Sequence, residues 1–236
     1  LPSKASVETS VRISIDHIGP YHPSMGGARY VLSCIEASTG YAMVATTSDK
    51  SMATSAKELE LMIIKYNNIL TEAKSLSFIH FVDNTSVSKL RADNAFNNDT
   101  IKKLLTKYKI TPQWTVTESS WQNGQVEAFN NILQDGVRCA FRTAHWMPFG
   151  LWAEAVHAFT YTYNRTPTAT RSGKSPHELI TGKVPKTEHL RVWGSPCSFR
   201  RTNTKMKTSD FKRYMSKGRD GFVVGYSNEH IHGSYL

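Results

Sequence analysis

Apolar and polar residues alternate along residues 11–16, Val-Arg-Ile-Ser-Ile-Asp, and this period of two predicts a half-buried β-strand. Two further runs that are rich in apolar residues, at residues 29–36 and 40–46, are also expected to be strands. The Ser-Thr-Gly turn at residues 38–40 joins them and predicts a hairpin. The chain is therefore expected to open with three strands.

A helical period follows these strands. Apolar residues recur every three or four positions over residues 52–70, which predicts an amphipathic helix. Asn98 or Asp99 is a suitable cap for a second helix, which Pro112 is expected to end. The remaining elements are strands within residues 77–92 and over residues 113–117, and long helices over residues 121–142 and 148–165. This order predicts an α/β layer fold with a mixed sheet.

Beyond Pro167 the sequence becomes rich in Thr, Ser, Gly, Lys and Pro, which is typical of a linker. A short helix over residues 176–181 is expected inside it, and β-like runs follow at residues 190–193, 197–200 and 221–226. The predicted domains are a leader (1–10), an α/β core (11–167), a linker (168–187) and the start of a small, incomplete β module (188–236).

The charge is unevenly distributed along the chain. Its 236 residues carry 29 Lys and Arg against 19 Asp and Glu, which gives a formal net charge of +10. Residues 1–100 hold 9 basic and 10 acidic side chains, whereas residues 101–236 hold 20 basic and 9 acidic ones. Such a basic half favours a polyanion as partner, nucleic acid above all, with an ordinary solvated surface as the alternative.

Several classes of protein are excluded by composition. No run approaches ~18 consecutive apolar residues, so no transmembrane span is expected. The three Cys lack the CxxC spacing of a local zinc finger and are too few for a disulfide scaffold. The chain begins with Leu1 and shows no signal peptide, so we expect it to be a piece of a longer protein.

Three acidic residues fall where they can share one site. Asp16 and Asp93 end predicted strands, where an open α/β sheet exposes functional groups. Glu127 belongs to a polar stripe of the helix at residues 121–142 and can point over the sheet toward them. Converging carboxylates can hold two Mg²⁺ ions about 4 Å apart, an arrangement that suits phosphodiester chemistry. The alternative is that these residues are two loop caps and a solvated helix residue.

The order of several short motifs resembles the integrases of copia-type long-terminal-repeat retrotransposons and, more broadly, retroviral integrases. The core motifs are D-H-I-G-P at residues 16–20, L-R-A-D-N at 90–94 and Q-N-G-Q-V-E-A-F-N at 122–130. Further motifs follow in the family's order: W-A-E-A at 152–155, Y-N-R-T-P at 163–167, S-P-H-E at 175–178, H-L-R-V-W-G at 189–194 and G-F-V-V-G-Y at 221–226. Each motif is short, but together they span nearly the whole chain.

The resemblance implies a ribonuclease H-like fold, with a mixed five-stranded sheet flanked by helices, followed by a small SH3-like β module. It implies that Asp16, Asp93 and Glu127 are the catalytic and metal-binding residues, with two Mg²⁺ or Mn²⁺ ions per site. The implied reaction is the trimming of element DNA 3′ ends and their transfer into target DNA. Asp83 is a rival for the second acid, but its spacing to Glu127 is too long for the family.

The resemblance also implies partners and a location. The partners are DNA, further copies of the chain and a zinc-binding module upstream in the parent polyprotein. The expected location is the nucleus, preceded by a cytoplasmic particle. The candidate DNA-binding residues are Asn94, Gln122, Asn123, Asn130, Lys205, Lys207, Lys212, Arg213 and Lys217.

The surroundings of the third acid depart from the family's pattern. Ala128 and Asn131 stand where the family prefers basic residues, and Ala-Phe-Asn-Asn at residues 95–98 replaces its Gly-Gly-Glu-Phe. Fewer cations beside Glu127 mean fewer phosphate contacts. A second hypothesis is therefore a catalytically silent or domesticated remnant that binds DNA or chromatin.

Overall fold

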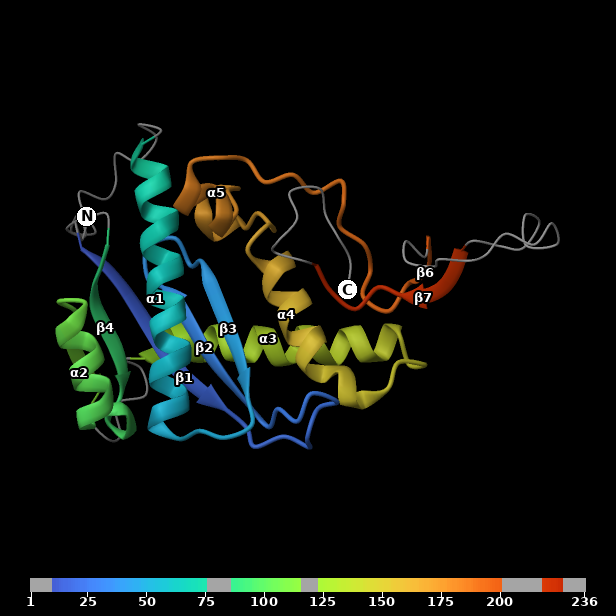
Figure 1. Cartoon of the computed structure of the whole chain (residues 1–236). Helices are drawn as coiled ribbons and strands as arrows, with labels where there is room; N and C mark the ends of the chain where they lie inside the picture. Colours follow the sequence, from blue (N-terminus) through green and yellow to red (C-terminus); the bar gives the residue numbers. More distant parts are fainter. Residues whose placement is uncertain (1–9, 76–85, 116–122, 201–217, 227–236) are drawn as a thin grey trace, which may run out of the picture.

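The fold is a mixed β-sheet with helices on both faces (Figure 1). The computed structural model describes residues 10–75, 86–115, 123–200 and 218–226. Within this part of the chain the order is three strands, helix, strand, helix, strand and two long helices, as predicted. None of the described helices is both long and apolar enough to cross a membrane.

The sheet has five strands in the order β3-β2-β1-β4-β5. The first three form an antiparallel meander, and the last two run parallel to β1 and to each other. The strands are β1 (Val11–Ile18), β2 (Tyr30–Glu36), β3 (Ala42–Thr47), β4 (Val87–Asp93) and β5 (Thr111–Thr115). The predicted mixed sheet of five strands is thus confirmed.

The helices begin where the sequence supplies caps. Asn98 accepts the main-chain N–H of Ile101 at 3.1 Å, and α2 starts at the next residue. Ser175 accepts the main-chain N–H of Glu178 at 3.1 Å, which starts α5 at Pro176 as predicted. The helices are α1 (Met52–Ser75), α2 (Asp99–Lys107), α3 (Gly124–Thr143), α4 (Trp152–Tyr163) and α5 (Pro176–Thr181), with 3₁₀ turns η1 (Asn94–Phe96), η3 (Phe149–Leu151) and η4 (Ala169–Arg171).

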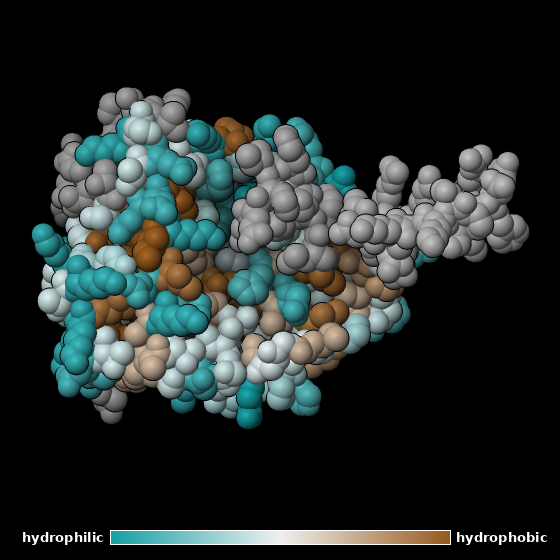
Figure 2. Space-filling view, in the orientation of Figure 1, coloured by the Kyte–Doolittle hydropathy of each residue, from teal (hydrophilic) through white to brown (hydrophobic). Residues whose placement is uncertain are grey.

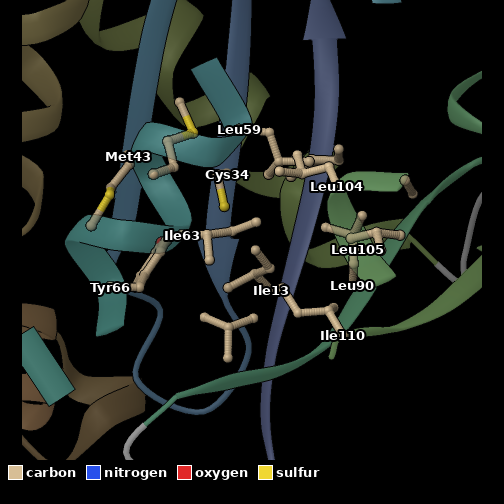
Figure 3. Close-up of a cluster of buried hydrophobic side chains, with 14 of the residues drawn as sticks. Ile13, Cys34, Met43, Leu59, Ile63, Tyr66, Leu90, Leu104, Leu105 and Ile110 are labelled. Atoms are coloured by element: carbon tan, nitrogen blue, oxygen red, sulfur yellow. The ribbon is translucent and has the colours of Figure 1, made fainter. Parts of the chain in front are cut away.

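One face of the sheet is covered by α1, α2 and α5. Alternate residues of β1, Ile13 and Ile15, are fully buried on this side. Figure 3 shows Ile13 with Leu59 and Tyr66 of α1 in the same cluster. Ile180 of α5 belongs to the same apolar cluster and is 1% exposed. Part of the segment that the sequence predicts as a linker thus contributes to the main core.

The opposite face of the sheet is covered by α3 and α4. Val126, Phe129 and Leu133, which recur every three or four residues along α3, are buried against strand residues such as Val31. Gly136 brings the two helices close together, because a Cβ atom built on it would lie 1.9 Å from the Phe159 ring of α4.

A short C-terminal part of the chain packs beside α3 and α4. Trp193 is buried with Ala144 and Ala158, and its indole donates to the carbonyl of Val224 at 3.0 Å. β6 (Pro196–Arg200) and β7 (Gly218–Phe222) pair antiparallel as a separate two-stranded sheet. The SH3-like character of this module remains a prediction.

Two sequence predictions about elements are wrong. Pro112 does not end α2, which already stops at Lys107; it lies within β5, which is the last strand on its side of the described sheet. An edge strand tolerates proline because one side of its backbone needs no ladder hydrogen bonds. Residues 190–193 lie between and at the start of two turns (188–189 and 193–194) and form no strand. The predicted strand residues before 86 and Asp83 lie outside the described residues.

Candidate active site

Asp16 lies near the end of β1, on the face of the sheet that α3 covers. Since Ile13 and Ile15 point toward α1, alternation places Ser14 and Asp16 on the other face. Its carboxylate accepts the main-chain N–H of His17 at 2.8 Å and the side-chain amide of Asn130 at 2.9 Å. Each carboxylate oxygen of Asp16 is thereby held by one donor, one from β1 and one from α3.

Asp93 lies beside Asp16 at the end of the neighbouring strand. β1 and β4 run parallel with Ser14 opposite Arg91, and extending this register by two residues sets Asp16 level with Asp93. Neighbouring residues in such a ladder share a face of the sheet. Asp93 is exposed, and its carboxylate accepts the main-chain N–H of Asn94 at 2.5 Å, which caps the turn η1.

Glu127 comes from the first turn of α3, between two asparagines that contact β1. Asn123 donates to the main-chain carbonyl of Ile15 at 3.3 Å, and Asn130 donates to Asp16. Residues at spacings of three and four lie on one side of a helix, so Glu127 also faces the end of β1. Asn123, Glu127 and Asn130 therefore share the side of α3 that faces β1.

The three carboxylates interact electrostatically. Burial raises the pKa of Asp16 from its usual value, and the charges of Glu127 and Asp93 raise it further. The His17 N–H and the Asn130 amide lower it in part. The structure thus brings the three predicted acids within electrostatic range, although no three His, Cys, Asp or Glu side chains of the described residues form a group that could hold a metal ion.

The other predicted site residues are placed differently. Asn94 is exposed and accepts the side-chain amide of Asn97 at 3.1 Å. Asn123 and Asn130 are each 6% exposed, so their side chains serve the contact between α3 and β1, and their Oδ1 atoms have no partner among the described residues. The predicted contacts Gln122, Lys205, Lys207, Lys212, Arg213 and Lys217 lie outside the described residues.

His17 was given no role by the sequence, yet it supports both aspartates. Its ring stacks on Phe96 of η1, with ring centroids 4.8 Å apart, and its Nε2 lies 3.1 Å from the hydroxyl of Ser55. Because this hydroxyl donates to the Ser51 carbonyl at 2.8 Å, the imidazole Nε2–H is the donor. Burial, with a smaller contribution from Lys50, lowers the pKa of His17 to about 4. The neutral ring therefore joins the end of β1 to the turn that follows Asp93.

The fold is that of the catalytic cores of retroviral integrases. The chain is similar to the structure of the HTLV-2 integrase catalytic core domain in complex with magnesium, in a trimeric form. The TM-score is 0.51 at 14% identity, and the match covers 72% of this chain and 95% of that one. It is also similar to a chain in the simian T-cell lymphotropic virus intasome in complex with PP2A regulatory subunit B56 gamma. There the TM-score is 0.56 at 12% identity, over 90% of this chain and 67% of that one.

In sequence, the chain is similar to the retrovirus-related Pol polyprotein from transposon TNT 1-94 of Nicotiana tabacum. The two are 28% identical over 110 residues, which is 46% of this chain and 8% of the polyprotein. No family model matches the chain. The predicted resemblance to retrotransposon and retroviral integrases is thus confirmed, in sequence by the transposon polyprotein and in fold by the viral cores.

Proposed function

We propose that this chain is the catalytic part of a retrotransposon integrase, a metal-dependent polynucleotidyl transferase that trims element DNA 3′ ends and joins them to target DNA. The observation that carries the proposal is the convergence of Asp16, Asp93 and Glu127 from two parallel strands and a helix. The similarity to a transposon Pol polyprotein and to viral integrase cores supports it.

The chemistry of the three acids suits Mg²⁺ or Mn²⁺, although in the described structure they are not gathered closely enough to form a metal-holding group. Carboxylate oxygens are the hard ligands that these ions prefer. The negative charges of the neighbouring acids repel that of Asp16 and so raise its pKa, and a bound divalent cation would reduce this repulsion. We propose that Asp16 and Asp93 hold one ion, and Asp16 and Glu127 a second. When bound, the ions would stabilise charge on the attacking and leaving oxygens at a phosphodiester.

The chain's own residues orient this donor set. The Asn130 amide and the His17 N–H fix the two oxygens of Asp16, so the carboxylate cannot rotate away from Asp93 and Glu127. Asn123 fixes the start of α3 to the main chain of β1 and thereby sets the height of Glu127 above the sheet. We assign all three as positioning residues for the carboxylates.

Several further features belong to the same proposal. DNA is the proposed partner because of the basic second half of the chain, and the predicted contacts at Lys205, Lys207, Lys212, Arg213 and Lys217 lie in that half. The chain would work as a multimer in the nucleus, after a stage in a cytoplasmic particle, together with an upstream zinc-binding module. A catalytic core over residues 11–167 followed by a small β module stays part of this proposal.

The test compares Glu127→Gln with Asp135→Asn in a strand-transfer assay with Mg²⁺ or Mn²⁺ and element-end DNA. Both substitutions turn one acid of α3 into its amide, but Asp135 is exposed and forms an ion pair with Arg138. We expect Glu127→Gln to abolish joining and Asp135→Asn to preserve it. Equal joining by wild type and Glu127→Gln would refute the enzymatic proposal.

The second candidate, a silent DNA-binding remnant, is favoured by the uncharged residues Ala128, Phe129 and Asn131 around Glu127. The same assay separates the two, because the remnant would bind DNA without trimming or joining it. Calorimetric titration with Mn²⁺ adds a readout that is independent of activity. Loss of Mn²⁺ binding in Glu127→Gln, with binding kept in Asp135→Asn, is expected only if Glu127 faces the ion.

A further inference from the structure

The outer edge of β3 offers unpaired main-chain groups. β3 is the last strand on its side of the described sheet, and the Asn164 side chain bonds both the N–H (2.8 Å) and the carbonyl (2.7 Å) of Ala42. These groups of Ala42 face away from β2. Backbone direction alternates along a strand, so the N–H and carbonyl groups of Val44 and Thr46 face outward as well. They have no hydrogen-bond partner within the described part of the chain.

This edge forms the floor of a groove of about 790 Å³. Figure 1 shows β3 between α1 and α4, and these two helices supply two walls of the groove: Lys65 from α1, and Glu154, His157 and Tyr161 from α4. Val224, Gly225 and Tyr226 of the C-terminal part also line the groove. In Figure 2, which shows the same side, the surface between the two helices mixes hydrophilic and hydrophobic residues. β3 is separated from β4 by β2 and β1, so the groove lies at the far edge of the meander from the candidate active site. None of the three acids of that site lines the groove.

Two cations line the groove without an acidic partner in the described chain, Lys65 and Arg165. The Arg165 guanidinium lies 3.4 Å from the centre of the Tyr161 ring, and it donates to the Tyr161 carbonyl at 3.0 Å. Burial lowers the pKa of Lys65, and the charge of Arg165 lowers it further. The two positive charges therefore repel each other, and a negative group between them would stabilise both.

Glu154, on the α4 wall of the groove, supplies a hydrogen-bond acceptor. Its Oε2 atom is buried and has no partner among the described residues, although Glu154 lines the groove. It belongs to the start of α4, whereas Arg165 follows the end of that helix. The groove thus offers cations toward one end, an acceptor toward the other, and alternating donors and acceptors along its floor.

We propose that this groove binds an extended acidic segment of a partner protein, which adds a strand to the edge of β3. A strand matches the floor because its own N–H and carbonyl groups repeat at the same spacing, ~6.8 Å for every second residue. An acidic side chain of the segment would lie between Lys65 and Arg165, and a donor would reach Glu154. A nucleic acid fits less well, because phosphates cannot donate to Glu154 or to the outward carbonyls of Val44 and Thr46.

The experiment is a selection of random seven-residue peptides displayed on phage, panned on the whole chain and then on Lys65→Glu. Lys57→Glu is the matched control, because Lys57 is an exposed lysine of the same helix that does not line the groove. We expect peptides with an acidic residue to be enriched, and their synthetic forms to bind Lys65→Glu about tenfold more weakly or worse. Lys57→Glu should bind them like the wild type. Methylation of alternate backbone nitrogens of the peptide should abolish binding.

Three outcomes would overturn the proposal. The first is that no enriched peptide depends on Lys65. The second is that a ten-residue oligothymidine binds the wild type and loses affinity in Lys65→Glu, which would assign the groove to nucleic acid. The third is that Lys65→Glu alters the mass measured by sedimentation equilibrium, which would assign it to a second copy of the chain. Strand transfer by Lys65→Glu should stay at the wild-type level, so the result does not depend on the proposed enzyme activity.

Discussion

The candidate active site and the β3 groove lie on the same sheet but are built by opposite means. At the active site, Asp16 and Asp93 come from adjacent parallel strands, and like charges are held together against their repulsion. At the groove, Lys65 and Arg165 come from separate helical regions, and the sheet contributes mainly its backbone edge. The comparison teaches that the ends of neighbouring strands inside the sheet bring side chains together, whereas the edge strand leaves main-chain groups open to a partner.

The largest expected effect follows substitution at the active site. Asp16→Asn should reduce strand transfer about a thousandfold if the proposed function holds, since removal of one proposed metal-binding carboxylate would cost about 4 kcal/mol of transition-state stabilisation. It should also raise the free energy of unfolding at neutral pH. The folded protein holds the Asp16 proton to a higher pH than the unfolded chain does, so stability is lost as the pH rises through the raised pKa.

Urea denaturation between pH 4 and pH 7 checks this pair of effects. The stability advantage of Asp16→Asn should grow toward neutral pH, because the variant lacks the carboxyl that must ionise in the folded state. Asp135→Asn, at an exposed ion pair, should change neither activity nor the pH dependence. A variant that is less stable at pH 7 would contradict the electrostatic description of the site.

The next largest effect tests the helices behind the groove. Gly136→Ala should lower the free energy of unfolding by about 3 kcal/mol, because the added methyl group would overlap the Phe159 ring and force α4 away from α3. Gly124→Ala, in the same helix, has open space around its Cβ position and should be neutral or stabilising. Equal midpoints for the two variants in urea would show that the helices are not in close contact at Gly136.

A smaller effect is expected where α4 meets the sheet edge. Asn164→Ala leaves the N–H and carbonyl of buried Ala42 without partners and should cost about 2–3 kcal/mol. Amide hydrogen exchange at Ala42 should speed up, while exchange in β1 stays slow. Asn97→Ala, which removes only an exposed contact with Asn94, serves as the control. Unchanged exchange at Ala42 would mean that Asn164 does not protect the edge.

The smallest effect concerns the histidine beside the acids. The folded protein keeps His17 neutral to about pH 4, whereas the unfolded chain binds the proton near pH 6.5. Stability should therefore fall as the pH drops from 6.5 to 4, by about 2 kcal/mol. His17→Phe keeps a ring against Phe96 and should flatten this slope, whereas His145→Gln, at an exposed position, should not. A slope that survives His17→Phe would assign it to other groups.

The sequence was sufficient to bring the three acids of the candidate site together, because the signals that place them are local. The alternation of residues 11–16 fixes which side of β1 carries Asp16, and the stripe of α3 fixes the side that carries Glu127. The roles of Asn130 and His17 could not be predicted, because each depends on an atom of another element, the Asp16 carboxylate and the Phe96 ring. The prediction that Pro112 ends a helix was wrong because proline is also tolerated in a strand that lies at the edge of a sheet, and edge position cannot be seen in the local sequence.

The groove could not be predicted from the sequence, because it too depends on contacts between distant elements. Y-N-R-T-P at residues 163–167 marked the family, but nothing in it indicates that Asn164 bonds a strand 122 residues earlier. That contact depends on β3 being the outer strand and on α4 ending beside its first residue. Edge position is a property of the whole topology, which no short window of residues encodes.

The packing of Ile180 and Trp193 has a consequence for how far the chain could be shortened. Ile180 packs in the main core with residues of α1, and Trp193 packs with Ala144 after the end of α3 and with Ala158 of α4. A chain stopped at residue 167 would keep all three acids but open a cavity in the main core and uncover Ala144 and Ala158. Loss of Ile180 alone is worth about 2–5 kcal/mol, a large share of the stability of a domain of this size. The part of the chain that packs as one unit therefore extends well beyond the last of the three acids.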